Sequence, residues 1–462
     1  MLTDRLKEIV GPLGWTTAPD TLAPHLLERR GNFRGKALIM VMPESTEQVS
    51  RIVAACAENR TALVPQGGNT SLCAGAIPDD SGKQVLLSLS RLSAIRSVDP
   101  DDFSIVVDAG CILANVQKAA VEVGRIFPLS LSAEGSCQIG GNLATNAGGI
   151  NVLRYGTARQ QVLGLEVVLA DGTIWNGLRS LRKDTAGYDM KQVFLGSEGT
   201  LGVITAASLK LYPNPGNTTT AWVAMESAQH AVQMLARVRE TLSDQVLAFE
   251  LMSDRALRFV RRHISDVTLP FGDNYPWHVL LDVAVADRQE ALEGALAAAI
   301  EEGIAVDAII AKSAKEAEKF WRIRHSISDA QRPEGANLKH DISVPISQIG
   351  TFLTRGQTLL ENMMPEARLV AFGHVGDGNL HYNIAQPAGA DAAEFLAAGT
   401  ELSDAIYKLV DDLDGSFSAE HGVGVSKKAL LALYRGSAEI DLMRTLKRAL
   451  DPQNILNPGK VI

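Results

Sequence analysis

The chain has 462 residues, more than one hydrophobic core usually organises, so two or three packed domains are expected. Apolar residues make up 46% and charged residues 21%, which excludes a disordered, collagen-like or membrane-spanning protein. The formal net charge of -9, with no long run of Lys or Arg, excludes charge-driven binding to nucleic acid or to an anionic membrane.

Local patterns predict mixed helices and strands. Residues 45–60 have helical spacing behind a Ser/Thr start, and they lead through a short apolar run into a glycine-rich turn. From 85 to 110 and from 162 to 212, β-branched runs broken by Asp-Gly and Asn-Pro indicate sheet. These segments predict an α+β arrangement for the first half of the chain.

The middle of the chain predicts a separate α+β domain. Strand-like stretches near 221–225 and 278–285 are each followed by an Ala/Glu-rich helical segment, at 227–242 and 287–303. A cluster of Pro, Gly and Asn at 213–219 indicates the boundary before it, and a mostly helical tail follows residue 404. The expected division is therefore 1–215, 216–403 and 404–462.

Three features of the sequence indicate the cellular compartment of the protein: its four cysteines, its first residues and its hydropathy. The cysteines are scattered without a C-x-x-C pair, which predicts a reducing compartment and excludes a disulfide scaffold or thiolate zinc site. The opening Met-Leu-Thr-Asp-Arg-Leu-Lys-Glu lacks the pattern of a signal or transit peptide. No segment offers about 18 uninterrupted apolar residues, so no membrane span is expected. We therefore expect a cytoplasmic protein.

Three glycine-rich loops are candidates for binding an anionic cofactor: 65–75, 140–149 and 196–202. Paired glycines allow conformations in which successive N–H groups converge on an anion, so a pyrophosphate would fit the first loop. None of the loops matches the G-x-G-x-x-G or G-x-x-x-x-G-K-[ST] patterns, so NAD and P-loop sites lack support. Each loop alone can be a plain turn, but together they form a stronger signal.

A metal site is predicted from three separate residues. His374 and His381 bracket an Asp-Gly pair that predicts a two-residue hairpin, which would pair 374 with 381 and place their Cβ atoms about 5 Å apart. Asn383 would share that face, and Glu420 would complete a set of two histidines and one carboxylate. The alternative is a pair of hydrogen-bonded structural histidines, and the pattern does not separate zinc from manganese or iron.

A cationic substrate site is predicted beside it. Arg324 and Ser328 lie four residues apart on a predicted helix over 314–330, so they share a face and together could hold a carboxylate. Lys339 follows on a predicted strand. Both cations could equally be solvated surface charges.

Several of these segments resemble a known family. Pro65–Gly75, Gln138–Gly149 and Phe194–Ile204 resemble the FAD-binding domain of the vanillyl-alcohol-oxidase-type flavoproteins. The segments 374–381, 418–424 and 451–458 are similar to the D-lactate and D-2-hydroxyglutarate dehydrogenase branch of that superfamily. The resemblance covers nearly the whole chain in the expected order.

This resemblance implies an α+β fold with a VAO/PCMH-type FAD-binding domain of two α+β subdomains (1–215), an α+β substrate or cap domain (216–403) and a helical segment (404–462) that packs back on the FAD domain. The flavin is expected to be non-covalent, because Asn69 stands where a histidyl link would be sought, although Cys73 and Cys137 keep a cysteinyl link open. The residues expected to contact FAD are Pro65, Gly67, Gly68, Asn69, Thr70, Ser71, Gly75, Gly140, Gly141, Asn142, Thr145, Asn146, Gly148, Gly149, Glu198, Gly199, Ile204 and Asn457.

The resemblance also implies a reaction. His374, His381 and Glu420 correspond to the metal ligands, with zinc expected, and His421 is the candidate general base because histidine titrates near physiological pH. The expected activity is oxidation of D-2-hydroxyglutarate to 2-oxoglutarate by hydride transfer to flavin N5. The expected substrate contacts are Arg324, Ser328, Lys339, Asn383 and His421.

Alternatives stay open. D-lactate, D-malate or glycolate could be the substrate, although the second cation, Lys339, favours a dicarboxylate. The same residues could belong to a zinc hydrolase, or to a flavin-carrying subunit without catalytic function. The resemblance further implies an electron-transfer flavoprotein or a quinone as acceptor. A homodimer is also expected.

Overall fold

The computed structural model describes residues 1–272, 275–284 and 289–462. The chain forms two compact units: unit 1 comprises Met1–Gly148, Tyr155–Asn214 and Glu420–Ile462, and unit 2 comprises Gly149–Arg154 and Pro215–Ala419. The boundary expected at residue 404 falls inside α13 (Ala392–Asp412), which belongs to unit 2 because its buried face, including Leu402 and Ile406, packs into that unit's core. The C-terminal segment of unit 1 therefore begins at Glu420.

The first sheet of unit 1 has four strands in the order β1-β2-β4-β3, and β2 and β3 both run parallel to β4. The crossover between β2 and β3 is the helix α3, whose N-cap Ser45 accepts a hydrogen bond from the Gln48 amide. Its apolar face, which includes Val49 and Ile52, is fully buried. The elements are α1 (Leu2–Val10), β1 (Trp15–Thr16), α2 (Pro19–Leu22), β2 (Ile39–Val41), α3 (Thr46–Glu58), β3 (Leu63–Gln66) and β4 (Val85–Ser88).

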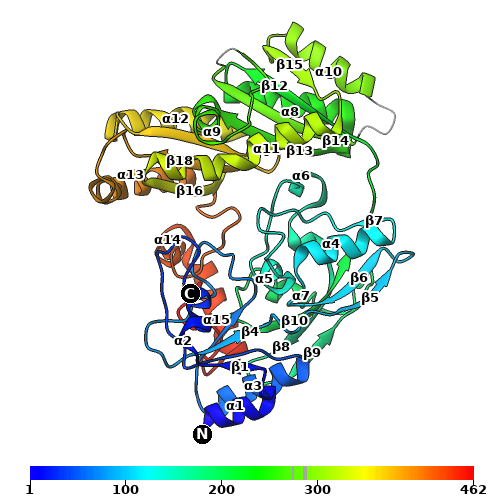
Figure 1. Ribbon diagram of the computed structural model, residues 1–462, viewed down its shortest axis with the longest axis vertical. Coiled ribbons are helices and arrows are strands. Elements are labelled where there is room, and N and C mark those ends of the chain that lie inside the picture. The colour runs from blue at the N-terminus through cyan, green and yellow to red at the C-terminus, as the bar shows by residue number, and fades with distance from the viewer. Residues whose placement is uncertain (273–274, 285–288) are drawn as a thin grey trace. The chain divides into compact units, whose positions relative to one another are not determined.

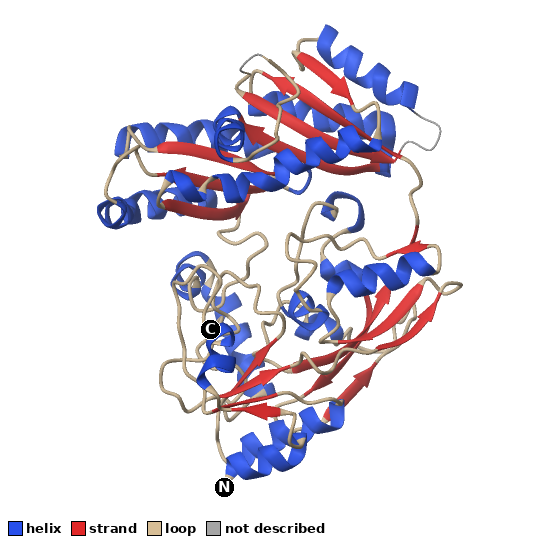
Figure 2. Cartoon of the chain, viewed as in Figure 1, coloured by secondary structure: helices blue, strands red, loops and turns tan. Residues whose placement is uncertain are grey.

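The second sheet of unit 1 is antiparallel, with the order β5-β6-β10-β8-β9. Every residue of β8 is buried, as a strand covered on both faces requires. The remaining strands and helices of unit 1, among which β7 and β11 pair in a separate two-stranded sheet, are β5 (Ile95–Asp99), β6 (Ser104–Asp108), α4 (Leu113–Glu122), β7 (Arg125–Ile126), α5 (Ile139–Ala144), β8 (Val162–Val168), β9 (Ile174–Gly177), α7 (Lys191–Phe194), β10 (Val203–Lys210), β11 (Tyr212–Pro213), α14 (Lys428–Tyr434) and α15 (Ser437–Leu450). Figure 2 shows these helices and strands by type.

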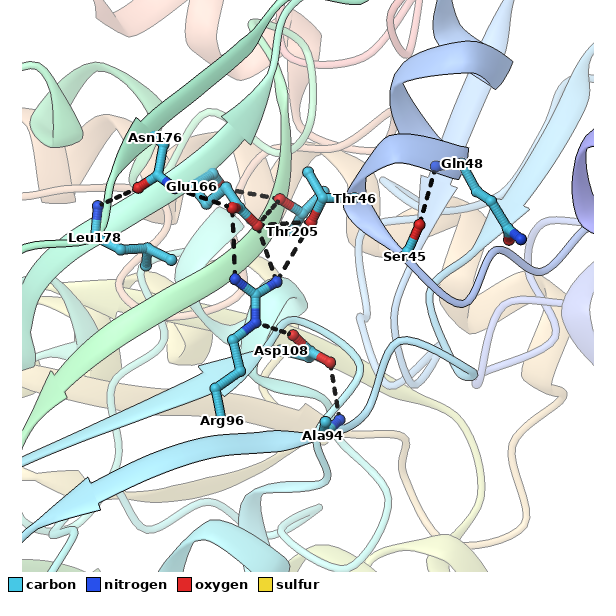
Figure 3. A network of polar contacts seen from close by, with 10 residues as sticks. All are labelled: Ser45, Thr46, Gln48, Ala94, Arg96, Asp108, Glu166, Asn176, Leu178 and Thr205. Atoms are coloured by element: carbon cyan, nitrogen blue, oxygen red, sulfur yellow. Dashed lines mark hydrogen bonds and ion pairs between the residues drawn. The ribbon is translucent and has the colours of Figure 1, made fainter.

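A buried polar network joins α3 to the second sheet (Figure 3). The Arg96 guanidinium donates to Asp108 at 2.6 Å and to Glu166 at 3.0 Å, and the hydroxyls of Thr46 and Thr205 donate to Glu166 at 2.6 and 3.0 Å. Burial would raise the pKa of Glu166, but these donors outweigh it and lower the pKa. The network satisfies two buried carboxylates and ties the two subdomains of unit 1 together.

Unit 2 is built on one seven-stranded sheet in the order β15-β12-β14-β13-β17-β18-β16, in which all neighbours are antiparallel. One face packs against α8, α10, α12 and α13, and part of the other face packs against α9 and α11 (Figure 1). The elements are α6 (Val152–Tyr155), which straddles the unit boundary, β12 (Thr218–Met225), α8 (Ala228–Leu242), β13 (Val246–Ser253), α9 (Asp254–His263), β14 (Trp277–Ala284), α10 (Gln289–Glu301), β15 (Asp307–Ile310), α11 (Ala314–Ala330), β16 (Asn337–Ser343), α12 (Ile349–Met363), β17 (Arg368–His374) and β18 (Asn379–Ala385).

The helix α11 spans the range that its sequence predicts. Ser313 caps it by accepting from the Glu316 amide at 3.3 Å, and the Glu316 carboxylate accepts from the Lys312 amide at 2.8 Å. Strand β14 and helix α10 also lie where strand and helix are expected, while residue 285 of that strand and residues 287–288 of that helix lie outside the described residues.

Short 3-10 helices link several elements: η1 (Ala23–His25), η2 (Ala158–Gln161), η3 (Ser243–Gln245), η4 (Arg332–Glu334), η5 (Ile346–Gln348) and η6 (Val375–Asp377). All four cysteines are buried as free thiols. Among the described residues, we find no helix with both the length and the apolar character needed to cross a membrane.

Candidate functional site

The three glycine-rich loops meet in unit 1, and we call residues 65–75, 138–148 and 196–202 the glycine cradle. The amide of Gly196 donates to Leu143 at 3.0 Å, and that of Glu198 donates to Ala144 at 2.8 Å. A Cβ on Gly67 would lie 3.5 Å from the backbone nitrogen of Gly141. Segments far apart in sequence therefore form one continuous backbone surface.

Glycine is needed at two positions of the cradle because other groups approach the backbone closely. A Cβ on Gly68 would lie 2.1 Å from the carbonyl oxygen of Ser136, and one on Gly140 would lie 2.6 Å from the Ala109 Cβ. Gly141 differs, because the nearest atom to its added Cβ outside its own helix is the Gly67 Cα, at 4.0 Å. The surface at Gly141 thus has room for a ligand to approach the backbone.

Asn457, from the C-terminal segment of unit 1, links two of the loops. Its side-chain amide donates to the carbonyls of Gly75 at 2.9 Å and Glu198 at 2.8 Å. Within the described part of the chain, Oδ1 of Asn457 and Oε1 of Gln138 are buried with no hydrogen-bond partner. Two orphaned acceptors beside an open glycine surface fit a dinucleotide such as FAD, which brings hydroxyl and N–H donors as well as a pyrophosphate.

Three side chains expected to contact FAD hold the cradle together. Asn69, at φ 52°, donates to the carbonyls of Pro24 at 3.0 Å and Leu27 at 3.2 Å. Asn146, at φ 49°, accepts from the Thr157 hydroxyl at 2.8 Å and the Arg159 amide at 3.0 Å.

Glu198 is the third such side chain, and its carboxylate accepts from the amides of Val423 at 2.7 Å and Gly424 at 2.9 Å. Burial raises the pKa of this carboxyl.

The other expected FAD contacts are distributed as follows. Ile204 is buried in β10, Asn142 is buried in α5, and the Thr145 hydroxyl donates to the Gly141 carbonyl at 3.0 Å. Gly149 is counted with unit 2. Pro65, Thr70, Ser71, Gly75, Gly148 and Gly199 lie in the loops of the cradle or beside them.

The two predicted metal-binding histidines lie on one face of the unit 2 sheet, with ring centroids 5.8 Å apart. The expected pairing of 374 with 381 is wrong, because His381 pairs with Phe372. The η6 turn, followed by Gly378 at φ 86°, lengthens the connection beyond a two-residue hairpin. The register differs by two residues, and since strand side chains alternate with period two, both imidazoles still share a face.

Glu420, the third predicted ligand, is the first residue of the C-terminal segment of unit 1. The chain before Glu420 is held by the amide of Ala419, which donates to the Asp341 carbonyl at 3.4 Å. Two imidazoles and one carboxylate are a donor set that fits zinc or a similar divalent ion.

Asp341 is a buried carboxylate in β16 that sequence reasoning did not single out. It lies opposite His381 in the pairing of β16 with β18. His421 has its Nε2 3.4 Å from Oε1 of Glu420.

The predicted substrate cations differ in their surroundings. Arg324 is only 7% exposed, so the alternative of a solvated surface charge is wrong for it, and its guanidinium lies 4.9 Å from the Phe372 ring centroid. Lys339 and Ser328 are exposed. Asn383 is buried on the face of His381, and its amide donates to Gln331 at 3.0 Å.

Glu250 is a site residue that sequence reasoning missed. It lies in the centre of β13, is completely buried, and contacts both Arg324 and His374. Burial would raise its pKa, but His374 and Arg324 outweigh that effect and hold the pKa well below its usual range. A sequence signal could have revealed Glu250, because it is the single acid in the otherwise apolar strand Val246-Leu-Ala-Phe-Glu-Leu-Met. A lone charge in a buried strand needs charged or hydrogen-bonding partners. We call Glu250, Arg324, His374 and His381 the charged cluster.

Two family models match the chain. One, described as FAD linked oxidases, C-terminal domain, matches residues 214–461, and the other, described as FAD binding domain, matches residues 37–177.

Individual relatives match over nearly the full length. The D-2-hydroxyglutarate dehydrogenase of Xanthomonas citri pv. viticola is 37% identical, over 99% of this chain and 96% of the relative. The mitochondrial D-2-hydroxyglutarate dehydrogenase of Bos taurus is 37% identical, over 96% of this chain and 80% of the relative. A solved structure of p-cresol methylhydroxylase with substrate bound has a TM-score of 0.77 at 15% identity, covering 100% of this chain and 96% of that one, so it shares the fold.

Proposed function

This chain belongs to the FAD-linked oxidase family, and from that membership we propose that it oxidises D-2-hydroxyglutarate to 2-oxoglutarate. It is an FAD-dependent dehydrogenase acting on a hydroxy acid. The observation that carries the choice of substrate is the 37% identity, over 99% of this chain, to a relative with that activity in its name.

FAD, when bound, supplies the acceptor for the hydride that leaves C2 of the substrate. We propose that the glycine cradle holds it, with backbone amides facing the pyrophosphate. Non-covalent binding is supported by Asn69, which is not a histidine and whose side-chain amide donates to two backbone carbonyls. It is also supported by the surroundings of the two nearby thiols, Cys73 and Cys137. The Cys73 thiol donates to the Gly422 carbonyl at 3.5 Å, and burial raises the pKa of Cys137, which disfavours the thiolate needed for attack.

His374, His381 and Glu420 would hold a divalent metal, with zinc as our proposal. When bound, it supplies a Lewis acid that lowers the pKa of the C2 hydroxyl and orients the C1 carboxylate. The donor types, and the 5.8 Å between the ring centroids of His374 and His381, support this assignment.

The remaining groups bind substrate and move its proton. We propose that His421 takes the hydroxyl proton as the hydride leaves C2, so that the carbon loses two electrons and becomes a ketone. Lys339, an exposed cation on the sheet face of His381, binds the carboxylate far from the reacting carbon. Asn383, Ser328 and Arg324 complete the proposed contacts. A second cation favours a dicarboxylate over D-lactate or glycolate, with D-malate as the alternative.

The electron acceptor that we propose is an electron-transfer flavoprotein or a quinone, on resemblance alone. Four buried free thiols support a reducing compartment, and we propose the cytoplasm. A homodimer is also proposed.

The test is an anaerobic absorbance titration of the purified protein with D-2-hydroxyglutarate, D-lactate and D-malate. We expect a flavin band that D-2-hydroxyglutarate bleaches fastest. Bleaching by D-lactate alone would refute the role of Lys339, and a colourless protein that cannot take up FAD would refute the proposed function.

A further inference from the structure

Glu250 lies at a fixed point in the sheet of unit 2. The pairing of β13 with β17 places it directly opposite His374, although the two residues are 124 positions apart in sequence. Directly opposed residues on one face of an antiparallel pair have adjacent side chains. The sheet itself therefore brings this carboxylate to the imidazole.

The carboxylate divides its two oxygens between two partners. Oε1 lies 2.5 Å from Nδ1 of His374, while Oε2 accepts from Nε and Nη2 of Arg324 at 2.7 and 2.6 Å. All three side chains are buried. The arrangement leaves neither oxygen without a donor.

This division determines which nitrogen of His374 can bind a metal. An ionised carboxylate only accepts hydrogen bonds, so Nδ1 must carry the proton and donate it to Oε1. The ring's coordinating lone pair is then on Nε2, and the hydrogen bond fixes the ring's rotation. Arg324 contributes by occupying Oε2 with two donors, which leaves Oε1 to His374.

We propose that Glu250 is a positioning residue, which holds His374 as an Nε2 metal ligand and holds Arg324 in a fixed orientation beside it. The inference rests on the metal site of the proposed function and deepens it. The buried carboxylate joins a metal ligand to a proposed substrate cation, so metal affinity depends on a residue that does not touch the metal.

The test compares two double variants that both remove the buried charge pair. Glu250→Gln with Arg324→Met keeps an acceptor oxygen for Nδ1, whereas Glu250→Leu with Arg324→Met has none. Replacing a buried ion pair with residues of similar volume is often neutral for folding, so both variants should fold. Circular dichroism and retained FAD check this before zinc affinity is measured by chelator competition.

We expect the glutamine variant to bind zinc with near wild-type affinity. The zinc affinity of the leucine variant should fall about 10–100-fold, the usual effect of removing the hydrogen-bond acceptor of a metal-binding histidine. Equal zinc affinities in the two variants would overturn the role of Glu250. The control is Glu334→Gln, which disrupts another ion-pair centre in unit 2 and should leave zinc affinity unchanged.

A wild-type protein that takes up no zinc would overturn the metal site and this inference together. Oxidation of D-2-hydroxyglutarate is read separately by flavin bleaching, so the two failures are distinguishable.

Discussion

The glycine cradle of unit 1 and the charged cluster of unit 2 are built from different parts of the chain. The cradle presents backbone, and its shape depends on positions such as Gly68 where a side chain would collide with neighbouring carbonyls. The charged cluster presents side chains on a sheet face, and it depends on hydrogen bonds such as that between Glu250 and His374. Small increases in side-chain volume should therefore disrupt the glycine cradle. Changes of charge or hydrogen bonding should disrupt the charged cluster.

The largest effect is expected for His381→Ala. Loss of a metal ligand should remove the bound zinc and lower kcat by about a thousandfold, because Lewis-acid stabilisation is worth several kcal/mol. FAD should be retained, since the cradle in unit 1 is untouched. Metal analysis, flavin absorbance and turnover measure the three quantities, and a variant with full turnover and no metal would refute the metal-dependent step.

The complementary change, Gly68→Ala, should weaken FAD binding and leave zinc binding unchanged. The added Cβ would lie 2.1 Å from the Ser136 carbonyl, so the loop must shift, and strain of this kind costs about 1–3 kcal/mol. We expect the FAD dissociation constant to rise about 10–100-fold by flavin titration, in line with that cost.

Gly141→Ala is the matched control for Gly68→Ala. With its nearest described neighbour at 4.0 Å, it should leave the stability of the apoprotein unchanged yet still weaken FAD binding. A Gly141→Ala protein with wild-type FAD affinity would show that the cofactor does not approach this surface.

Lys339→Ala should have a smaller and more selective effect. A hydrogen bond to a charged group is worth about 1.5–3 kcal/mol, so KM for D-2-hydroxyglutarate should rise about tenfold or more. KM for D-lactate, which lacks a second carboxylate, should not change. Steady-state kinetics with both substrates checks this, and equal losses for both would contradict the assignment.

The smallest effect is expected on stability, at a charge centre of unit 2 that lies away from the charged cluster. Glu334 binds Arg262, His263 and Arg368, and these donors outweigh burial to lower its pKa from 4.5 to about 2. Arg368 and His374 occupy opposite ends of β17, about 20 Å apart.

Because the pKa of Glu334 is lower in the folded state, its ion pairs stabilise the fold above the unfolded pKa and are lost as pH falls from 4.5 towards 2. Thermal unfolding of the wild type and Glu334→Gln should therefore differ most at neutral pH and converge near pH 2. A difference that persists at low pH would mean that packing, and not charge, carries the effect. Zinc and FAD contents should match the wild type at neutral pH.

Much of this protein followed from sequence alone. The α+β class, the position of α11 and the glycine-rich loops depend on local spacing, which is readable without a partner. The match to FAD-linked oxidase models bears out the flavoprotein interpretation. His374 and His381 share a face despite a wrong register, because a shift of two residues preserves strand alternation.

Only the tertiary structure revealed what surrounds those residues. Arg324 is buried and pairs with Glu250, which lies 74 residues away in the sequence. No local pattern specifies a pair at that separation. The sheet order brings β13 beside β17, which decides that Glu250 faces His374. Sequence determines which residue types lie on which face of an element. Partners between distant strands are fixed only when the whole core packs, since strand pairing depends on the burial of every neighbouring element at once.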